Sequence, residues 1–174
     1  VRNSIGYPHL NVKIGATHAG ISVGEDGATH QCLEDIALMR VLPNMTVFVP
    51  SDATECEQCV RAAAEINGPV YIRTARPPSP VYDARPFTVG KDCVIFTCGI
   101  MLEHCLEAVQ LLAEQGIDAA LVSFHTLKPF DDELARTYAA KCGKVFTVEE
   151  HSIIGGLGDA VASAICGMGL KHFE

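Results

Sequence analysis

A polar loop near the start of the chain holds residue types that often take part in chemistry. Residues 24–31 read GEDGATHQ, so Asp26 and His30 lie four positions apart among glycines. A carboxylate accepts hydrogen bonds from sugar hydroxyls, and imidazoles bind phosphate or move protons near neutral pH. The spacing matches neither an EF-hand calcium loop nor a Walker phosphate loop. Two interpretations stay open on spacing alone: a substrate contact, or a turn capped by Asp26 with His30 capping a helix that begins at Gln31.

Other candidate side chains follow predicted strands, where ligands bind in an open parallel sheet. His18 comes directly after residues 12–17, which are expected to form a short buried strand, and Arg73 and Arg76 come at the end of the strand expected at residues 70–74. Arg73 alternates with Tyr71, and its guanidinium could hold a phosphate through two hydrogen bonds. An arginine at such a position is also commonly just solvated.

A glycine-rich turn near the end of the chain invites a nucleotide-binding interpretation that its spacing does not support. Gly155 to Gly158 read GGLG between a predicted strand and a predicted helix, but Val161 stands where a dinucleotide fingerprint needs glycine or alanine. We interpret the run as a tight strand-to-helix turn. Residues 149–151, Glu-Glu-His, could form a proton relay, a packing contact or a contact between subunits.

Composition narrows the class of protein. The chain has 174 residues, 48% of them hydrophobic, and a formal net charge of -8, so we expect a folded globular chain with no nucleic-acid partner. No apolar run reaches the ~18 residues that cross a bilayer, so no membrane partner is expected. The eight cysteines fall in segments expected to be core, which predicts buried thiols and a cytoplasmic location. The start at Val1 suggests a fragment or a processed piece.

The pattern of elements predicts an α/β fold. Apolar strand-like segments alternate with helical patterns along the chain, which is typical of a parallel sheet covered on both faces. We therefore expect a three-layer sandwich. Prolines gather between Arg76 and Lys91, so we place a linker at residues 81–91 and a domain on either side, at residues 1–80 and 92–174.

Three stretches together resemble the C-terminal part of the transketolases. They are residues 13–52, residues 71–77 (YIRTARP) and residues 147–162 (TVEEHSIIGGLGDAVA). The order and spacing are closest to the C-terminal subunit of split transketolases, and the resemblance covers nearly the whole chain. It implies that residues 1–80 are the end of an incomplete pyrimidine-binding domain and that residues 92–174 are the transketolase C-terminal domain.

The resemblance also implies an activity and roles for four residues. Transketolases use thiamine diphosphate and Mg²⁺ to move a two-carbon ketol unit between phosphorylated sugars. By position, His18 and Arg73 resemble residues that bind the substrate phosphate, and Asp26 resembles the aspartate that contacts the sugar's C2 hydroxyl. His30 resembles the histidine near the reacting carbon, and we take it as the catalytic residue. The neighbours of His18, Ala19 and Gly20, depart from the Asp-Ser of many members.

Parts of the family's machinery are absent from this sequence. The glutamate that activates thiamine and the aromatic residue that packs against its ring would lie upstream of Val1, and the Gly-Asp-Gly metal motif belongs to another domain. We therefore assign no cofactor or metal ligand here and expect the chain to be inactive without an N-terminal transketolase subunit or domain. A homodimer through the C-terminal domain is also implied. Two alternatives remain, a piece of 1-deoxyxylulose-5-phosphate synthase or a non-catalytic assembly module.

Overall fold

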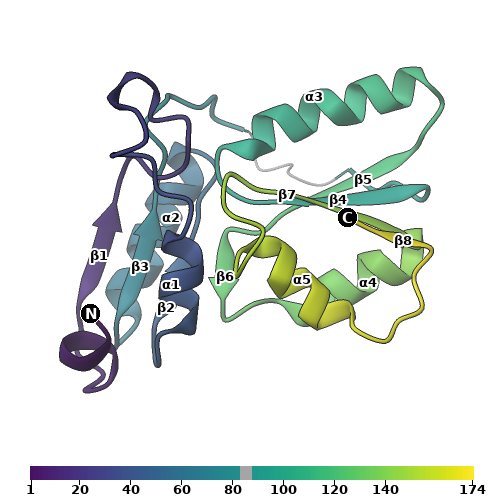
Figure 1. Cartoon of the computed structure of the whole chain (residues 1–174). Helices are drawn as coiled ribbons and strands as arrows, with labels where there is room; N and C mark the ends of the chain where they lie inside the picture. Colours follow the sequence, from purple (N-terminus) through teal and green to yellow (C-terminus); the bar gives the residue numbers. More distant parts are fainter. Residues whose placement is uncertain (83–87) are drawn as a thin grey trace.

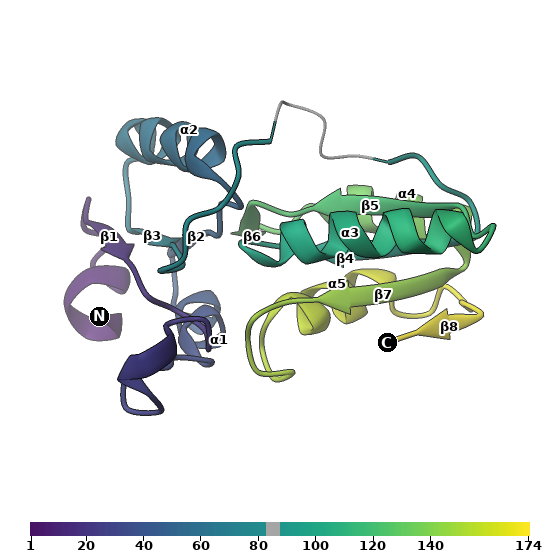
Figure 2. The same ribbon diagram turned by 90° about the horizontal axis from the view of Figure 1, so that it is seen from above.

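The computed structural model describes residues 1–82 and 88–174, whose strands form two four-stranded sheets. The first sheet has the order β1-β3-β2-β6 and the second the order β5-β4-β7-β8. The two sheets lie side by side, with helices on both faces of each (Figures 1 and 2). The predicted α/β fold with parallel, helix-covered sheets is confirmed. The predicted linker, residues 81–91, includes residues 83–87, which lie outside the described residues.

The first sheet is built mainly from the N-terminal half. Strands β1 (Lys13–Ala16), β3 (Val70–Arg73) and β2 (Thr46–Phe48) run parallel, and β3 lies between the other two. Helix α2 (Ala53–Glu65) packs on one face through Cys59 and Ala63. Helix α1 (Asp35–Val41) covers the other face (Figure 2). The central strand β3 is buried along its whole length, whereas β1 at the edge is half-buried rather than fully buried as predicted.

The second sheet comes entirely from the C-terminal half. Strands β4 (Cys93–Thr97), β5 (Ala119–Ser123), β7 (Lys144–Val148) and β8 (His172–Phe173) are all parallel. Helix α3 (Met101–Glu114) covers one face, and helices α4 (Asp132–Cys142) and α5 (Leu157–Ile165) cover the other (Figure 1). Asp52 and Asp131 cap α2 and α4 by accepting hydrogen bonds from the backbone N–H groups of Glu55 and Leu134.

The two halves are joined by a strand and by a common core. Strand β6 (Thr126–Lys128) belongs to the C-terminal half but pairs antiparallel with β2 of the first sheet. The largest cluster of buried side chains also spans both halves, with Ile36 and Val47 from one and Phe96 and Leu157 from the other. Burial of this apolar surface stabilises the junction, so the halves are packed as one body.

The structure differs from the sequence-based expectations in the start of one helix, in three short elements and in the burial of the cysteines. The helix that could begin at Gln31 begins only at Asp35, and the short strands β6 and β8 and the π-helical turn Arg2–Gly6 (η1) were not predicted. All eight cysteines are free, and five are buried, but Cys32 and Cys56 are half-buried and Cys166 is exposed, contrary to the prediction of uniformly buried thiols. Within the described residues, no helix is both long enough and apolar enough to cross a membrane.

Candidate functional site

The polar loop identified from the sequence follows β1 and lies beyond the carboxyl ends of β1 and β3 (Figure 1). Gly20 and Cys32 pair as an antiparallel bridge, with the Gly20 N–H 2.8 Å from the Cys32 carbonyl oxygen. Residues Gly24–Asp26 form a single 3-10 turn at the outer part of the loop. The backbone hydrogen bonds between Gly20 and Cys32 close residues 21–31 into a loop, which we call the acceptor loop.

Both predicted histidines are exposed, His18 just before this loop and His30 near its end. His18 lies just before the Gly20–Cys32 bridge, and its Nδ1 is 2.8 Å from the hydroxyl of Thr17. Its φ of 65° falls in the left-handed region, which is uncommon for a residue with a side chain and is found often at functional sites. His30 is exposed in the same loop with Nδ1 3.0 Å from Thr29 Oγ1. Because α1 begins at Asp35, the interpretation of His30 as a helix cap is wrong.

Asp26 is paired with an arginine, and that arginine is Arg76. The Arg76 guanidinium lies 2.7 Å from the Asp26 carboxylate, and each side chain is 45% exposed. The same Nη1 donates a hydrogen bond to the backbone carbonyl of Val23. Arg76 follows β3 and precedes Pro77, so it reaches from the end of the central strand to the acceptor loop. The pair places a cation and an anion together at an open surface.

Arg73 lies in the protein interior, away from the surface at which a substrate phosphate was expected to contact it. Its Nε donates to the Asp35 carboxylate at 2.9 Å, its Nη2 donates to the Glu150 carbonyl at 2.8 Å, and the residue is only 4% exposed. The Tyr71 hydroxyl also donates to Asp35. The burial of Tyr71, together with the Asp35 carboxylate, raises the pKa of the phenol well above its usual range. Arg73 is buried because β3 is the central strand of its sheet.

The Glu-Glu-His segment after β7 makes three separate contacts with its surroundings. The Glu149 carboxylate accepts hydrogen bonds from the N–H groups of Leu157 and Gly158 and so caps α5. The Glu150 carboxylate accepts from two backbone N–H groups of the acceptor loop. His151 Nε2 accepts from the Ala37 N–H of α1 at 3.3 Å. The sequence left this segment open between a proton relay, a packing contact and a contact between subunits, and no local pattern points to its partners.

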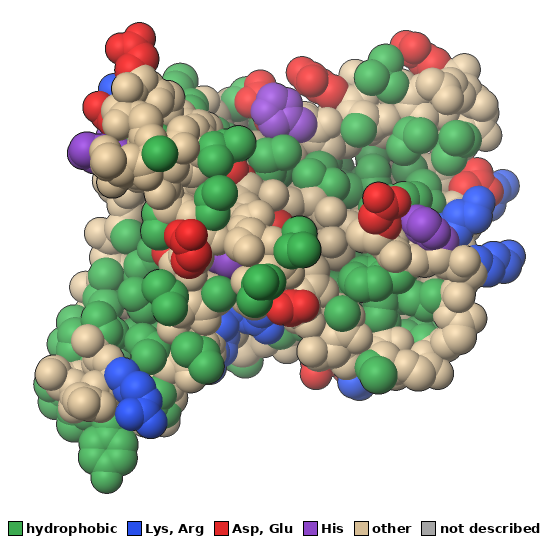
Figure 3. Space-filling model, in the orientation of Figure 1, with side chains coloured by type: hydrophobic (Ala, Val, Ile, Leu, Met, Phe, Trp, Pro, Cys, Tyr) green, Lys and Arg blue, Asp and Glu red, His purple; other side chains and the backbone are tan. Residues whose placement is uncertain are grey.

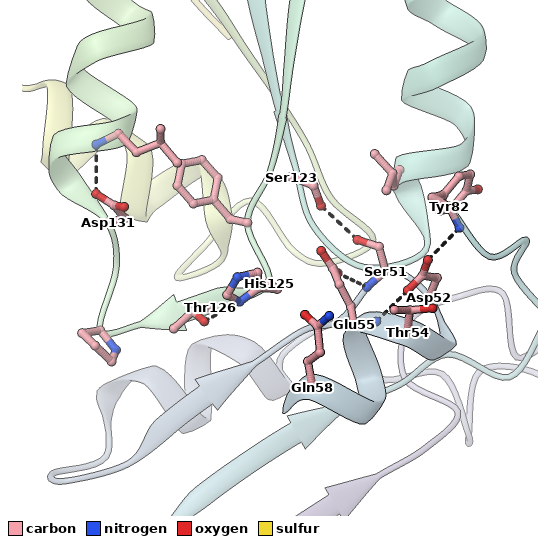
Figure 4. Close-up of a pocket in the computed structure, with 14 residues that line it drawn as sticks. Ser51, Asp52, Thr54, Glu55, Gln58, Tyr82, Ser123, His125, Thr126 and Asp131 are labelled. Carbon is pink, nitrogen blue, oxygen red and sulfur yellow. Dashed lines mark hydrogen bonds between the residues drawn. The ribbon is translucent and has the colours of Figure 1, made fainter. Parts of the chain in front are cut away.

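A cavity of about 490 Å³ lies between the halves (Figure 4), and most of its buried polar groups are hydrogen-bonded to each other or to the backbone, whereas the buried Tyr82 hydroxyl has no partner among the described residues. Asp52 accepts from the N–H groups of Glu55 and Tyr82, and Glu55 accepts from the N–H of Ser51. The Ser51 and Ser123 hydroxyls bond to each other. Side chains committed in this way have little capacity left for a ligand, so we favour the acceptor loop as the functional site. In the described part of the chain, no group of three or more His, Cys, Asp or Glu residues is arranged to hold a metal ion.

Comparison with protein families divides the chain into two parts. The transketolase pyrimidine-binding domain matches residues 1–80, and the transketolase C-terminal domain matches residues 84–173. Together these matches cover almost the whole sequence.

Individual proteins that are similar to this chain are also described as transketolases. A putative transketolase C-terminal section from Methanocaldococcus jannaschii is 44% identical over 98% of this chain and 57% of that protein. Human transketolase is 36% identical over 90% of this chain and 27% of that protein. A split-gene transketolase, described as an inactive β4 tetramer, superposes with a TM-score of 0.88 at 47% identity, covering 99% of this chain and 58% of that one. The chain thus spans little more than half the length of even the shorter relatives.

Proposed function

The chain belongs to the transketolase family, and from this membership we propose that it carries the substrate-binding loop of an enzyme that transfers a two-carbon ketol unit between phosphorylated sugars. The observation that carries the proposal is the exposed pair of Arg76 with Asp26 of the acceptor loop, with His18 just before the loop and His30 near its end. A phosphorylated sugar needs a cation for its phosphate and acceptors for its hydroxyls, and this surface offers both.

Each residue then has a separate task in our proposal. Arg76 takes the phosphate-binding role that the sequence suggested for Arg73, because Arg76 is half-exposed whereas Arg73 is buried against Asp35. His18 contributes a second donor to the same phosphate, and the Asp26 carboxylate accepts a hydrogen bond from the sugar's C2 hydroxyl. His30 lies near the reacting carbon, where an imidazole can hold or move a proton.

Thiamine diphosphate and Mg²⁺ belong to the intact enzyme in this proposal. The described residues offer no acidic or histidine cluster suited to the metal of the diphosphate, so this chain does not fit the role of metal-binding domain. The cofactor supplies the carbanion chemistry of ketol transfer when it is bound. We assign to this chain only the groups that bind and orient the sugar.

The proposed partner is an N-terminal transketolase section that holds the cofactor. The chain spans 57% of the Methanocaldococcus relative and 53% of a sulfofructose transketolase subunit from Clostridium. A second polypeptide or a further domain is then needed to complete the active site. Alone, we expect the chain to be inactive.

Assembly is a second candidate function, and an exposed apolar surface favours it. Four large side chains, Leu38, Val41, Ile153 and Ile154, are 59% to 87% exposed. They belong to α1 and to the turn before α5, which Arg40 holds together by donating from its Nη1 to the Gly155 carbonyl. Figure 3 shows hydrophobic side chains over this part of the molecule. We propose that a second copy of this chain covers the surface, since the split-gene relative is described as a tetramer.

One reconstitution experiment tests the proposed enzyme. The chain is mixed with an N-terminal transketolase section that also carries the missing first part of the pyrimidine-binding domain, together with thiamine diphosphate and Mg²⁺, and ketol transfer is followed with xylulose 5-phosphate as donor. We expect transfer only when both polypeptides are present. Transfer by the chain alone would contradict the proposal. Reaction with pyruvate instead would favour the 1-deoxyxylulose-5-phosphate synthase alternative, whereas the relatives compared above are all described as transketolases.

A further inference from the structure

The acceptor loop is held by a carboxylate from the opposite half of the molecule. Glu150 follows β7 in the C-terminal half, and its Oε1 accepts hydrogen bonds from the backbone N–H groups of Ile21 at 2.9 Å and Ser22 at 2.5 Å. The residue is only 8% exposed. Hydrogen bonds from backbone N–H groups to a carboxylate are stronger than those to neutral acceptors, so this contact fixes the start of the loop.

The loop is shaped to receive this carboxylate. Gly20 has a φ of 85°, and a Cβ placed on it would lie 2.2 Å from the carboxyl carbon of Glu150. A side chain at this position would displace the carboxylate, because real Cβ contacts are not found at such distances. Glycine therefore serves two needs here, the left-handed backbone and the close approach of Glu150.

Neighbouring contacts hold the other end of the same segment. The Ser152 N–H donates to the Leu33 carbonyl at 2.8 Å, and His151 accepts from the Ala37 N–H. The Glu150 carbonyl accepts from Arg73. The turn after β7 thus contacts the chain just before and just after the exposed residues Asp26 and His30, while it leaves those residues free at the surface.

Glu149 provides an internal comparison for Glu150. Both carboxylates are largely buried, and each accepts two backbone N–H groups. The Glu149 bonds end on α5 within its own half, but the Glu150 bonds cross to the acceptor loop. The Glu150 Oε2 atom is buried without a hydrogen-bond partner among the described residues. Burying the unpaired Oε2 atom costs free energy, and the two hydrogen bonds that Oε1 accepts from the acceptor loop offset part of that cost.

We propose that Glu150 is a positioning residue that sets the conformation of the acceptor loop and thereby the KM for the phosphorylated sugar. The inference rests on the proposed function for its kinetic consequence, but the contact itself does not. It gives the C-terminal domain an indirect part in substrate binding, because Ile21 and Ser22, which Glu150 holds, lie between His18 and Asp26. The oxygen that holds the loop touches neither substrate nor cofactor in this proposal.

Amide hydrogen exchange tests the contact on the chain as it exists. In Glu150→Ala we expect the Ile21 and Ser22 amides to exchange about tenfold faster or more, because both lose their acceptor. The matched variant Glu149→Ala should accelerate exchange at Leu157 and Gly158 and leave residues 20–31 unchanged. If Glu150→Ala folds poorly, Gly20→Ala disturbs the same contact from the loop side. Unchanged exchange at Ile21 and Ser22 in both variants would overturn the inference.

Kinetics of the enzyme reassembled with its N-terminal section test the consequence. Glu150→Ala should raise the KM for the phosphorylated sugar about tenfold with little change in kcat, because Glu150 holds the start of the loop beside Asp26 and makes no bond to His30. Glu150→Gln keeps an oxygen acceptor and should recover most of the KM, whereas Glu149→Ala should not change it. Equal KM effects from Glu149→Ala and Glu150→Ala would overturn the positioning role. Absence of ketol transfer in the wild-type assembly would instead overturn the proposed function, since amide exchange still decides the contact.

Discussion

Two arginines at the end of one strand serve the molecule in different ways. Arg73 pairs with Asp35 at 2.9 Å, and Arg76 pairs with Asp26 at 2.7 Å. The side chains of the first pair are 4% and 8% exposed, while both of the second pair are 45% exposed. Judged by the nitrogen–oxygen distance alone, the two ion pairs would be expected to be similar in strength. Burial separates them, because water screens the outer pair and leaves it free to exchange partners, whereas the inner charges depend on each other.

The difference shows which arginine can meet a ligand. Arg73 would have to leave Asp35 and the Glu150 carbonyl to bind a phosphate, and that would strand a carboxylate in the interior. Arg76 exchanges one exposed partner for another at small cost. We therefore assign a structural role to the buried cluster of Tyr71, Asp35 and Arg73, beside the apolar core that stabilises the junction, and recognition to the acceptor loop with Arg76.

The largest expected effect is on stability. Arg73→Ala should lower the free energy of unfolding by about 3–5 kcal/mol, because it leaves the Asp35 charge buried and unpaired. Urea denaturation of the chain measures this loss. The double variant Arg73→Ala/Asp35→Ala is the control, and it should be less destabilised than the sum of the two single variants. A loss below about 1 kcal/mol for Arg73→Ala would show that the buried pair does not have this structural role.

The exposed arginine should show the reverse behaviour. Arg76→Ala should raise the KM for phosphorylated sugars by roughly 10- to 100-fold, as expected for a lost charged contact of ~1.5–3 kcal/mol. Its free energy of unfolding should change by less than about 1 kcal/mol, because the pair is half-exposed. Steady-state kinetics of the enzyme reassembled with its N-terminal section measure the first effect. Arg76→Lys keeps the charge but not the guanidinium's fork of donors, so its KM should lie between those of the wild type and of Arg76→Ala. An unchanged KM would remove Arg76 from the site.

Most of the fold could be predicted from local sequence signals. Helix α2 has a capping aspartate at Asp52, and α4 has a cap at Asp131 and a left-handed glycine at Gly143. Those signals act within a few residues, so the sequence displays them directly. Strand β6 has no such signal. Its three residues Thr126–Lys128 become a strand because β2 from the other half offers a free edge, which depends on how the halves pack.

The site was predictable in location but not in its arginine. The expectation that ligands bind beyond the carboxyl ends of parallel strands leads to the acceptor loop and to Arg73 and Arg76 together. Choosing between them requires knowledge that β3 lies between β1 and β2, a pairing between residues far apart in the chain. The role of Glu150 could not be predicted, because its partners Ile21 and Ser22 lie more than 120 residues earlier.

Alkaline pH should probe the buried cluster separately. Burial and Asp35 raise the pKa of Tyr71, so the folded protein keeps this phenol protonated above the pH of ~10 at which the unfolded chain ionises it. The contribution of Tyr71 to stability is therefore complete below pH ~10 and decreases above it by up to ~1.4 kcal/mol per pH unit. Unfolding of wild type and Tyr71→Phe from pH 8 to 11 measures this as a shrinking difference between them. Tyr7→Phe, at an 80% exposed tyrosine, is the matched control. A difference that stays constant to pH 11 would contradict the assignment.

The smallest expected effect is at Arg61 and Glu57, the most exposed of the three arginine–carboxylate pairs compared. Arg61 and Glu57 on α2 lie 2.7 Å apart, as close as Arg76 and Asp26, but their side chains are 77% and 64% exposed. Arg61→Ala should change the free energy of unfolding by less than about 0.5 kcal/mol, and 1 M salt should remove even that, because two solvated side chains lose rotational freedom for a screened attraction. Urea denaturation with and without salt provides the measurement. If Arg61→Ala cost as much as Arg73→Ala, contact distance rather than burial would govern these pairs, and the separation of a structural from a recognition arginine would lose its physical basis.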